Sequence, residues 1–274
     1  MNTPKTVTVN NLVIGRGQPL TIISGPCVIE DEEHTLACAR TLKAMLSAFP
    51  VQFIFKACYD KANRMSYTSF RGPGLVRGLE ILQRVKQEVG VPVISDVHSP
   101  EEVDQAAQVL DVIQIPAFLC RQTDLVVKAA STGLPLHVKK GQFMAPWDMK
   151  TVVDKIEAAG NHKIILADRG TSFGYNNLVS DMRSIPIMQR FGYPVCFDAS
   201  HSVQRPGAQG TSSGGDREFI APLARAAIAC GCNVLFIETH PTPETAKSDA
   251  SIVYPLAELP ELLKVLVRLY EVVN

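Results

Sequence analysis

Apolar residues form two kinds of pattern along the chain. Short runs rich in Val, Ile and Phe predict strands, and the segments between them, where apolar residues recur every three or four positions, predict helices. Several short runs are apolar at nearly every position, which is typical of a parallel sheet whose outer face is covered. The predicted strands are residues 21–28, 53–58, 92–97, 112–117, 136–140, 163–169, 194–200 and 232–239.

The helical segments complete the pattern. A late one repeats leucine at helical spacing from Leu256 to Leu269 and has Pro260 near its start, where proline is tolerated. Eight strand–helix units predict an α/β fold closed into a (β/α)8 TIM barrel, so we expect a single domain over residues 1–274. A doubly wound open sheet is the alternative. It usually has a glycine-rich phosphate loop after its first strand, and residues 25–27 (GPC) do not form one.

Two segments lie outside this repeat. Residues 7–15 precede the first predicted strand, and Asn10 and Asn11 between apolar residues predict a short N-terminal β-hairpin that plugs the bottom of the barrel. Residues 202–215 follow the seventh strand and are rich in Gly and Ser. A long loop of this composition predicts a flexible lid.

Composition narrows the class of protein. Lys plus Arg number 27 and Asp plus Glu number 27, so the formal net charge is zero, which argues against nucleic acid or an acidic membrane as a partner. No uncharged apolar run approaches the ~20 residues of a membrane helix, and residues 1–5 do not resemble a signal peptide. Seven scattered cysteines suit free thiols in a reducing compartment. We therefore expect a cytoplasmic protein.

Charged side chains gather at the carboxyl ends of the predicted strands, where the active site of a barrel lies. One set would converge with few nearby carboxylates, and it consists of the cations Lys56, Lys61, Lys139 and Arg169. Such a set suits a small anion that bears both a phosphate and a carboxylate. The alternative is a ring of salt bridges inside the barrel with Asp96, Asp168 and Asp198.

A second set combines a thiol, an imidazole and two carboxylates, and it consists of Cys27, His201, Glu238 and Asp249. These residues follow strands one, seven and eight, and strands one and eight adjoin when the barrel closes. A thiolate with an imidazole favours Zn²⁺, Fe²⁺ or Mn²⁺ over Mg²⁺. The residues alone favour a packed Cys27 thiol over a metal ligand, because the ligands are dispersed and form no short metal motif.

Several motifs point to one family. They are residues 61–64 (KANR), 69–74 (SFRGPG), 114–118 (QIPAF), 121–124 (RQTD), 173–175 (FGY) and 238–241 (ETHP), and they run in order through essentially the whole chain. In these motifs the chain resembles the 3-deoxy-D-manno-octulosonate 8-phosphate synthases. The resemblance implies a homotetrameric barrel that condenses phosphoenolpyruvate with D-arabinose 5-phosphate and releases phosphate. The sugar acid product supplies the lipopolysaccharide inner core of Gram-negative bacteria, and similar proteins occur in plants.

The resemblance also implies roles for individual residues. The phosphate of phosphoenolpyruvate would lie on Lys139 and Arg169, and its carboxylate on Lys61 and Gln142. The aldose phosphate would lie on residues 63–64, across a subunit boundary. The expected substrate-binding residues are Lys56, Asn63, Arg64, Asp96, Ala117 through its backbone N–H, Phe118, Gln142 and Arg169. The expected catalytic residues are Lys61, Lys139, His201 and Asp249, the last two as proton shuttles as well as metal ligands.

The same resemblance bears on the metal. The family has metal-dependent members with Cys at the position of Cys27 and metal-independent members with Asn there. This chain has the Cys, and residues 201–207 (HSVQRPG) and 248–250 (SDA) resemble the metal-dependent branch. The resemblance therefore implies that Cys27, His201, Glu238 and Asp249 bind one divalent transition ion, with Zn²⁺, Fe²⁺, Mn²⁺ and Co²⁺ as candidates.

One position departs from the family pattern. Related sequences usually carry Ser after the KANR motif, and that Ser is associated with the aldose phosphate. This chain has Met65, and a thioether cannot donate a hydrogen bond to phosphate. The role is therefore not carried over to Met65.

Three other functions stay open at this point. A 3-deoxy-D-arabino-heptulosonate 7-phosphate synthase uses erythrose 4-phosphate, but its motif reads KPRT, whereas this chain has Ala62 and Asn63. A sialic-acid-type synthase usually carries an extra C-terminal domain, whereas this sequence ends after the eighth predicted helix. A non-catalytic sugar-phosphate sensor on the same barrel is the third, and a turnover assay would distinguish it from an enzyme.

Overall fold

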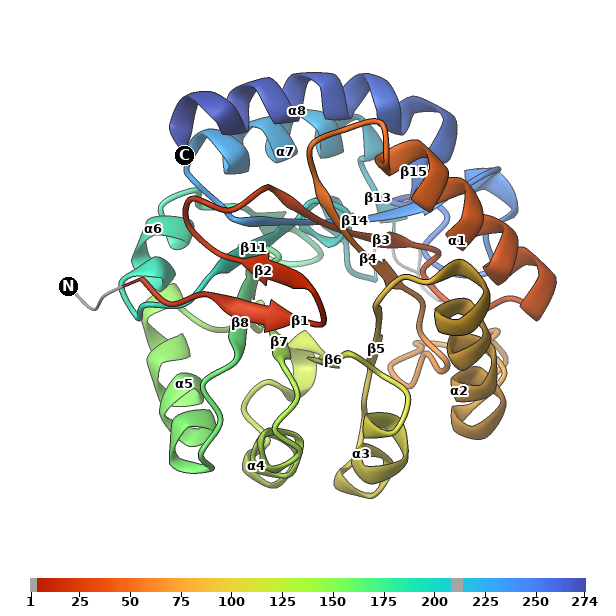
Figure 1. The fold of residues 1–274 in the computed structure, drawn as a ribbon, viewed down its shortest axis with the longest axis horizontal. Helices are drawn as coiled ribbons and strands as arrows, with labels where there is room; N and C mark the ends of the chain where they lie inside the picture. Colours follow the sequence, from red (N-terminus) through yellow and green to blue (C-terminus); the bar gives the residue numbers. More distant parts are fainter. Residues whose placement is uncertain (1–3, 208–213) are drawn as a thin grey trace.

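Eight parallel strands close into a barrel in the computed structural model, which describes residues 4–207 and 214–274 (Figure 1). Neighbouring strands pair in chain order, and β14 closes the ring by pairing with both β11 and β3. The barrel strands are β3 (Thr21–Gly25), β4 (Gln52–Lys56), β5 (Val93–Asp96), β6 (Val112–Ile115), β7 (Leu136–Lys139), β8 (Ile164–Asp168), β11 (Val195–Asp198) and β14 (Val234–His240). The predicted (β/α)8 barrel is confirmed.

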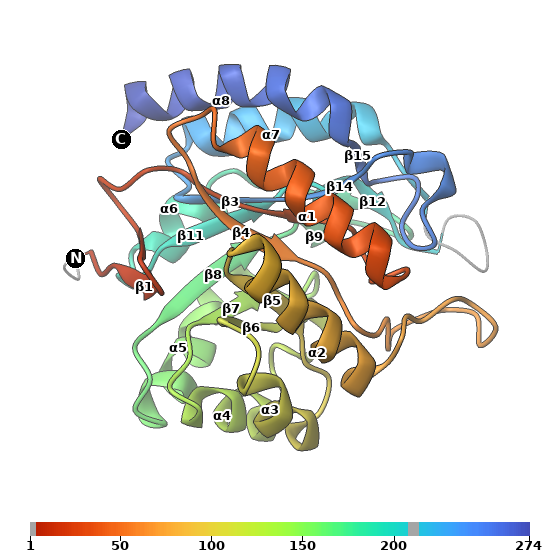
Figure 2. The ribbon, with the colours of Figure 1, turned by 45° about the vertical axis from the view of Figure 1, so that its right-hand side comes forward.

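Helices follow the barrel strands and cover the outside of the barrel (Figures 1 and 2). They are α1 (Glu32–Leu46), α2 (Leu75–Arg84), α3 (Pro100–Ala107), α4 (Thr123–Ser131), α5 (Met149–Ala158), α6 (Ser184–Gln189), α7 (Ile220–Ala229) and α8 (Leu259–Val273). The predicted leucine stripe buries Leu259, Leu263 and Leu266 against the barrel, and Pro260 lies in the first turn of α8. None of the described helices combines the length and apolarity that a bilayer span needs.

Seven of the eight barrel strands end earlier than the sequence pattern predicts, and β14 ends one residue later, at His240. The first predicted strand runs to residue 28, whereas β3 ends at Gly25, which has φ +153°. A Cβ atom at Gly25 would overlap the carbonyl oxygen of Lys56, so only glycine fits where the two chains approach. The chain turns away from the sheet there, and Cys27 lies in the turn that follows.

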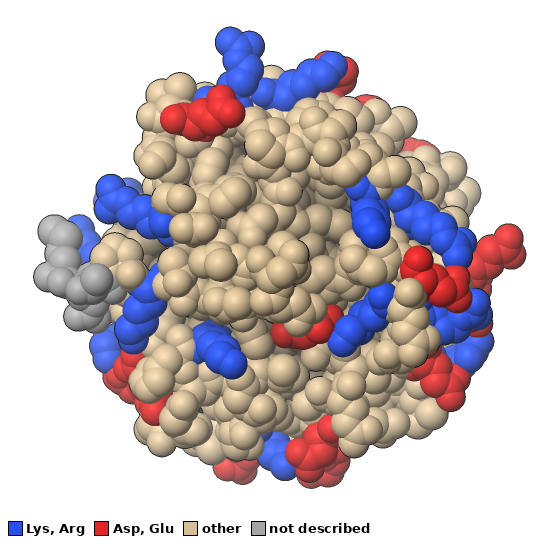
Figure 3. Space-filling view, viewed as in Figure 1, with Lys and Arg blue, Asp and Glu red and all other residues tan. Residues whose placement is uncertain are grey.

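The N-terminal hairpin closes one end of the barrel. β1 (Val7–Val9) and β2 (Leu12–Ile14) pair antiparallel, and Asn10 in the turn adopts φ +52°, a left-handed conformation that asparagine tolerates. Val7, Val9 and Ile14 are buried in one apolar cluster with the inward-facing side chains of the barrel strands. The hairpin and the plug are therefore confirmed. On this face most charged side chains lie toward the edge (Figure 3).

Loops form the opposite end of the barrel. Figure 2 shows the hairpin and both termini at one end and the loop between β4 and α2 extending from the other. Short ladders add to this end: β9 (Thr171–Ser172) with β10 (Leu178–Val179), β12 (Gln204–Arg205) with β13 (Gly214–Gly215), and β15 (Tyr254–Pro255) beside β14. The predicted lid, residues 202–215, includes residues 208–213, which lie outside the described residues.

The cysteines bear out one prediction from composition. All seven are free thiols, and six of them are buried. Cys232, for example, packs in the apolar layer between the strands and the helices. Cysteine in this chain therefore acts as a small packing residue at several positions, so any special role for Cys27 must come from its particular neighbours.

Candidate active site

A cavity of about 630 Å³ opens at the carboxyl ends of the barrel strands. It is lined by every predicted site residue except Cys27: Lys56, Lys61, Asn63, Arg64, Asp96, Ala117, Phe118, Lys139, Gln142, Arg169, His201, Glu238 and Asp249. The Cys27 thiol lies beside the cavity, 2.9 Å from the Asp249 carboxylate. The structure thus brings together residues that are dispersed over more than 200 positions of the sequence.

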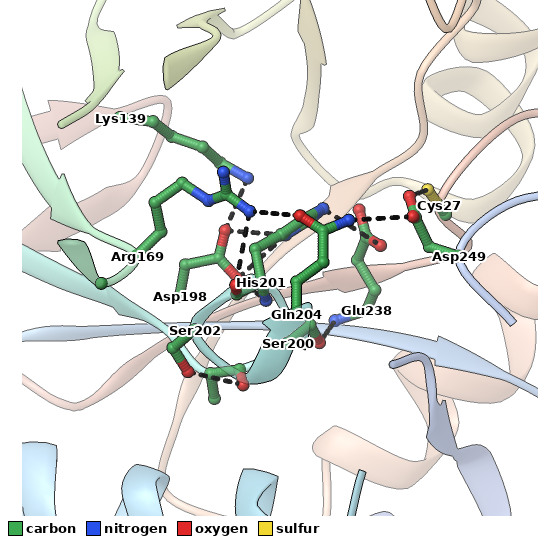
Figure 4. A network of polar contacts seen from close by, with 12 residues as sticks. Cys27, Lys139, Arg169, Asp198, Ser200, His201, Ser202, Gln204, Glu238 and Asp249 are labelled. Atoms are coloured by element: carbon green, nitrogen blue, oxygen red, sulfur yellow. Dashed lines mark hydrogen bonds and ion pairs between the residues drawn. The ribbon is translucent and has the colours of Figure 1, made fainter. Parts of the chain in front are cut away.

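Three of the four expected metal ligands meet on one side of this cavity, and the fourth, His201, lies beside them. Donor atoms of Cys27, Glu238 and Asp249 all lie within 4.8 Å of one another. His201 lies next to this group, with its Nε2 3.8 Å from Oε2 of Glu238, but it is not within 4.8 Å of all three ligands. Figure 4 shows Cys27 and Asp249 on one side of Glu238, with His201 close to it.

The surroundings of His201 prepare its Nε2 for a ligand. Nδ1 lies 2.9 and 3.1 Å from the two carboxylate oxygens of the fully buried Asp198. In the neutral ring Nδ1 therefore carries the proton and donates to Asp198, which leaves the lone pair of Nε2 free. A carboxylate that holds the outer nitrogen of a metal-binding histidine is a common arrangement.

Buried charge at Glu238 also suits a cation. Its Oε2 is buried without a hydrogen-bond partner, although Oε1 pairs with Lys56. Burial alone would raise the pKa of Glu238, but nearby positive charge, that of Lys56 above all, outweighs it and lowers the pKa to about 2. The carboxylate is thus ionised, with one oxygen free to bind a cation.

The thiol and Asp249 form the other half of the group. Burial, together with the negative charges of Asp249 and Glu238, raises the pKa of the Cys27 thiol, so the thiol donates its proton to Asp249 here. A bound divalent ion would replace that proton. Asp249 adopts φ +51°, a strained backbone conformation that is common at functional sites. A thiol, an imidazole and two carboxylates with an orphaned oxygen fit a transition metal ion.

The cations divide into paired and unpaired groups. The expectation of few nearby carboxylates is wrong for Lys139, whose Nζ is 2.7 Å from Asp198, and for Lys56, which pairs with Glu238 and donates to the carbonyl of Cys27. The pair of Lys139 and Asp198 belongs to the alternative, a ring of salt bridges inside the barrel, whereas Lys56 pairs with Glu238 outside that ring. Lys61 and Arg169 make no ion pair within the described residues.

Lys61 and Arg169 therefore place two positive charges in the cavity that are not held in a direct ion pair, although carboxylates such as Asp96 and Asp249 line the same cavity. Lys61 is 8% exposed, and its ammonium donates to the thiol of Cys58 at 3.5 Å. Arg169 is 4% exposed and donates to the side chain of Gln204 at 2.8 Å and the carbonyl of His201 at 3.3 Å, and its Nε is buried without a partner. Figure 4 places Lys139 and Arg169 together on the side of Asp198 away from Cys27. This arrangement suits a small dianion.

The outer rim of the cavity is more open. Asn63 is exposed, and Arg64 donates to two backbone carbonyls, those of Phe70 at 3.0 Å and Lys247 at 3.2 Å. Phe118 is 53% exposed, whereas its neighbour Ala117 is buried. The rim thus offers a guanidinium without a carboxylate partner in the described chain, which is available to an anion.

Sequence reasoning missed two side chains of this site. Asp198 was considered only as a salt-bridge partner, yet it holds both Lys139 and His201. Cys58 was not singled out, yet its thiol donates to Asp96 at 3.0 Å and accepts from Lys61. The signal for Cys58 was its position two residues after Lys56, because alternate residues of an extended segment face the same way.

A second group of possible ligands, Glu30, His34 and His240, lies nearby. Nε2 of His240 is 3.4 Å from Glu30, but its Nδ1 accepts the backbone N–H of Thr242 at 3.0 Å. The proton of the neutral ring is therefore on Nε2, which lies near Glu30 without a hydrogen bond and offers no lone pair to a metal ion. Glu30 also accepts the backbone N–H of Lys247, so this group supports the loop that carries Asp249.

Comparison with known proteins agrees with this barrel and site. The chain belongs to the DAHP synthetase I family, whose profile matches residues 3–274. Within that family it is similar to proteins named 2-dehydro-3-deoxyphosphooctonate aldolase. The protein from Protochlamydia amoebophila is 59% identical over 268 residues, which cover 98% of each chain. The protein from Geobacter metallireducens is 60% identical over 258 residues, which cover 94% of this chain and 95% of the relative.

Proposed function

We propose that this chain condenses phosphoenolpyruvate with D-arabinose 5-phosphate and water to give 3-deoxy-D-manno-octulosonate 8-phosphate and phosphate. The observation that carries the proposal is the pair of buried cations without a direct ion pair in the described chain, Lys61 and Arg169, in one cavity with a thiol–imidazole–carboxylate group. Relatives named 2-dehydro-3-deoxyphosphooctonate aldolase, at 57–60% identity, support it. The product would enter the synthesis of the lipopolysaccharide sugar Kdo.

The inner end of the cavity would hold phosphoenolpyruvate. Arg169 and Lys139 would bind its phosphate with the backbone N–H of Ala117, and Lys61 and Gln142 would bind its carboxylate. Gln142 is 5% exposed and Lys61 8%, so their contacts to the substrate would be shielded from water and correspondingly strong. Holding both anionic groups fixes the direction in which C3 of the enol faces.

The reaction forms one carbon–carbon bond. C3 of phosphoenolpyruvate bonds to the aldehyde carbon C1 of the aldose, whose oxygen takes up a proton. Water adds at C2, and cleavage of the bond between C2 and the phosphate oxygen then releases phosphate. His201 and Asp249 line the same cavity, and they would take a proton from the water or give one to the aldehyde oxygen. A divalent ion on Cys27, His201, Glu238 and Asp249 would supply a positive charge that polarises an oxygen ligand.

The rim would hold the phosphate of the aldose. Asn63 and Arg64 line the cavity there, and the guanidinium is free of carboxylates within the described residues. The aldehyde of the same molecule would then lie toward the metal group, between the rim and the phosphoenolpyruvate subsite. This division of the cavity accounts for two anionic substrates in one site and supports a sugar phosphate as the second substrate.

The remaining expectations belong to the same proposal. We propose a single barrel domain, a cytoplasmic location, a bound Zn²⁺, Fe²⁺, Mn²⁺ or Co²⁺ ion, and a homotetramer. Support for the assembly comes from large aromatic side chains that are more than half exposed on the loops of the mouth: Phe118, Phe143, Trp147, Phe173 and Tyr175. Exposed apolar side chains gathered on one face commonly mark an interface between proteins.

The test is a phosphate-release assay with phosphoenolpyruvate and a panel of aldose phosphates, with and without a chelator. We expect arabinose 5-phosphate to be used well and erythrose 4-phosphate poorly, because the chain has Ala62 and Asn63 where heptulosonate synthases have Pro and Arg. Equal kcat/KM for the two aldoses would overturn the assignment. Binding of both substrates without turnover would favour the non-catalytic sensor.

A further inference from the structure

A buried lysine outside the cavity connects the two loops of the proposed phosphoenolpyruvate subsite. Lys140 follows β7 directly, has no exposed surface, and does not line the cavity. Its ammonium lies 3.3 Å from the carbonyls of Gly141 and Met144, 3.1 Å from the carbonyl of Gly170 and 3.1 Å from Oγ1 of Thr171. The carboxylate of Asp168 is 3.7 Å away.

A cation in this position is costly. Transfer of an ammonium group from water to a protein interior is unfavourable unless partners replace its hydration. Burial lowers the pKa of Lys140, although Asp168 opposes that shift. Most of its partners are neutral oxygens of the two loops rather than carboxylates, so the group is arranged to hold backbone in place and not to form a simple ion pair.

The two loops carry residues that the proposed function assigns to phosphoenolpyruvate. The loop after β7 contains Gln142, between the two carbonyls that Lys140 holds. The loop after β8 contains Arg169, directly before Gly170. A second link runs beside the first, because the backbone N–H of Ser172 donates to the carbonyl of Gln142 at 2.9 Å.

The side chains on these loops need such support. Oε1 of Gln142 and Nε of Arg169 are buried and have no hydrogen-bond partner. Hydrogen bonds therefore hold only part of the Gln142 and Arg169 side chains. The positions of these side chains depend on the backbone of the two loops. A small displacement of a binding group is expected to have a large effect on a bound anion.

We propose that Lys140 is a positioning residue that sets the spacing between Gln142 and Arg169 and so tunes the affinity for phosphoenolpyruvate. This inference rests on the proposed function. It adds a residue that does not touch the substrate, and it makes the distance between the loops after β7 and β8 depend on a buried charge as well as on the backbone hydrogen bond from Ser172 to Gln142.

The experiment compares Lys140→Met, which keeps the length of the side chain and removes the charge, with wild type. We expect KM for phosphoenolpyruvate to rise by about ten- to a hundredfold, while KM for arabinose 5-phosphate changes less than about twofold. Calorimetric titration with phosphoenolpyruvate alone should show the same loss. Lys150→Met, which removes an exposed lysine of α5, is the matched control and should match wild type.

The outcomes separate the possible explanations. A folded Lys140→Met variant with unchanged phosphoenolpyruvate affinity, or with both KM values raised equally, would overturn the inference. If that variant does not fold, Thr171→Val removes a single partner of the ammonium and should raise KM for phosphoenolpyruvate by about two- to fivefold; no change there would also overturn it. Wild type that fails to bind phosphoenolpyruvate would instead contradict the proposed function.

Discussion

The inner end of the cavity and its outer rim are built differently. At the inner end Lys139, Asp198 and Glu238 are buried and contact one another or their neighbours directly. At the rim Asn63 is exposed, and Arg64 contacts backbone carbonyls. The inner end is therefore organised before a substrate arrives, whereas the rim has fewer contacts within the described chain. Substitutions inside should have large effects, and those at the rim small ones.

The largest effect should come from Cys27, whose thiolate sets this group apart from a Mg²⁺ or Ca²⁺ site. We expect Cys27→Ala to lose bound metal and turnover together. We also expect chelation to abolish the activity of wild type, and Mn²⁺, Fe²⁺, Co²⁺ or Zn²⁺ to restore it to different degrees. Metal content by elemental analysis and phosphate release are the measurements.

Controls sharpen this test. Cys232→Ala removes another buried thiol far from the cavity and should retain the metal. Cys27→Asn imitates the metal-independent members of the family, and we expect some activity without metal. Full activity of wild type after exhaustive chelation, with negligible metal remaining, would make Cys27 a packing residue and leave the synthase assignment in place.

Next in size is the loss of a cation at the inner end. Arg169→Ala removes charge-assisted hydrogen bonds worth about 1.5–3 kcal/mol, so kcat/KM for phosphoenolpyruvate should fall by roughly ten- to a hundredfold. The melting temperature should change little, because Arg169 has no carboxylate partner in the described chain. Lys139→Ala should weaken binding similarly but also lower the melting temperature, since it leaves Asp198 buried with one partner fewer. Unchanged kinetics in both variants would show that these cations are structural.

These pairings mark the limit of what the sequence could predict. Short apolar runs that alternate with helical segments predicted the strands. The carboxyl ends of parallel barrel strands lie on one rim, so the charged residues there could be predicted to converge. They did not show which charges oppose each other: Lys139 on β7 and Asp198 on β11 pair across the intervening β8. Cys27 was ambiguous for the same reason, because only the folded chain brings it to Asp249, 222 positions later.

A buried histidine inside the barrel should make the stability of the protein depend on pH. His137 is fully buried inside the barrel and contacts Gln114, which in turn donates to Asp96. Burial, with the charge of Lys139 nearby, lowers its pKa to about 3. The unfolded chain takes up the proton near pH 6.5, so this contribution to stability is complete above that pH and is lost as pH falls toward 3.

Because of His137, the free energy of unfolding should decrease by about 2–3 kcal/mol when the pH falls from 7 to 4.5. His137→Asn retains a donor near the position of Nδ1 but does not titrate, so its stability should fall less over that interval. Urea unfolding of both proteins at the two pH values measures the difference. Equal decreases in the two proteins would show that His137 does not remain neutral in the fold.

The smallest effect is expected at the rim, where Met65→Ser restores the hydroxyl usual in the family. Met65 is 58% exposed and lies against Gly207, so its loss removes little buried surface, and the melting temperature should stay near that of wild type. A new hydrogen bond to the aldose phosphate is worth about 0.5–1.5 kcal/mol, which would lower KM for arabinose 5-phosphate by roughly two- to tenfold and leave KM for phosphoenolpyruvate unchanged. Tyr67→Ser, at a fully exposed position that does not line the cavity, should alter neither constant.

If Met65 packs against a neighbouring subunit, the Met65→Ser substitution will instead lower the melting temperature and shift the sedimentation coefficient toward smaller species. That result would assign the rim to an interface, and the difference between the two ends of the cavity would then be a property of the isolated subunit.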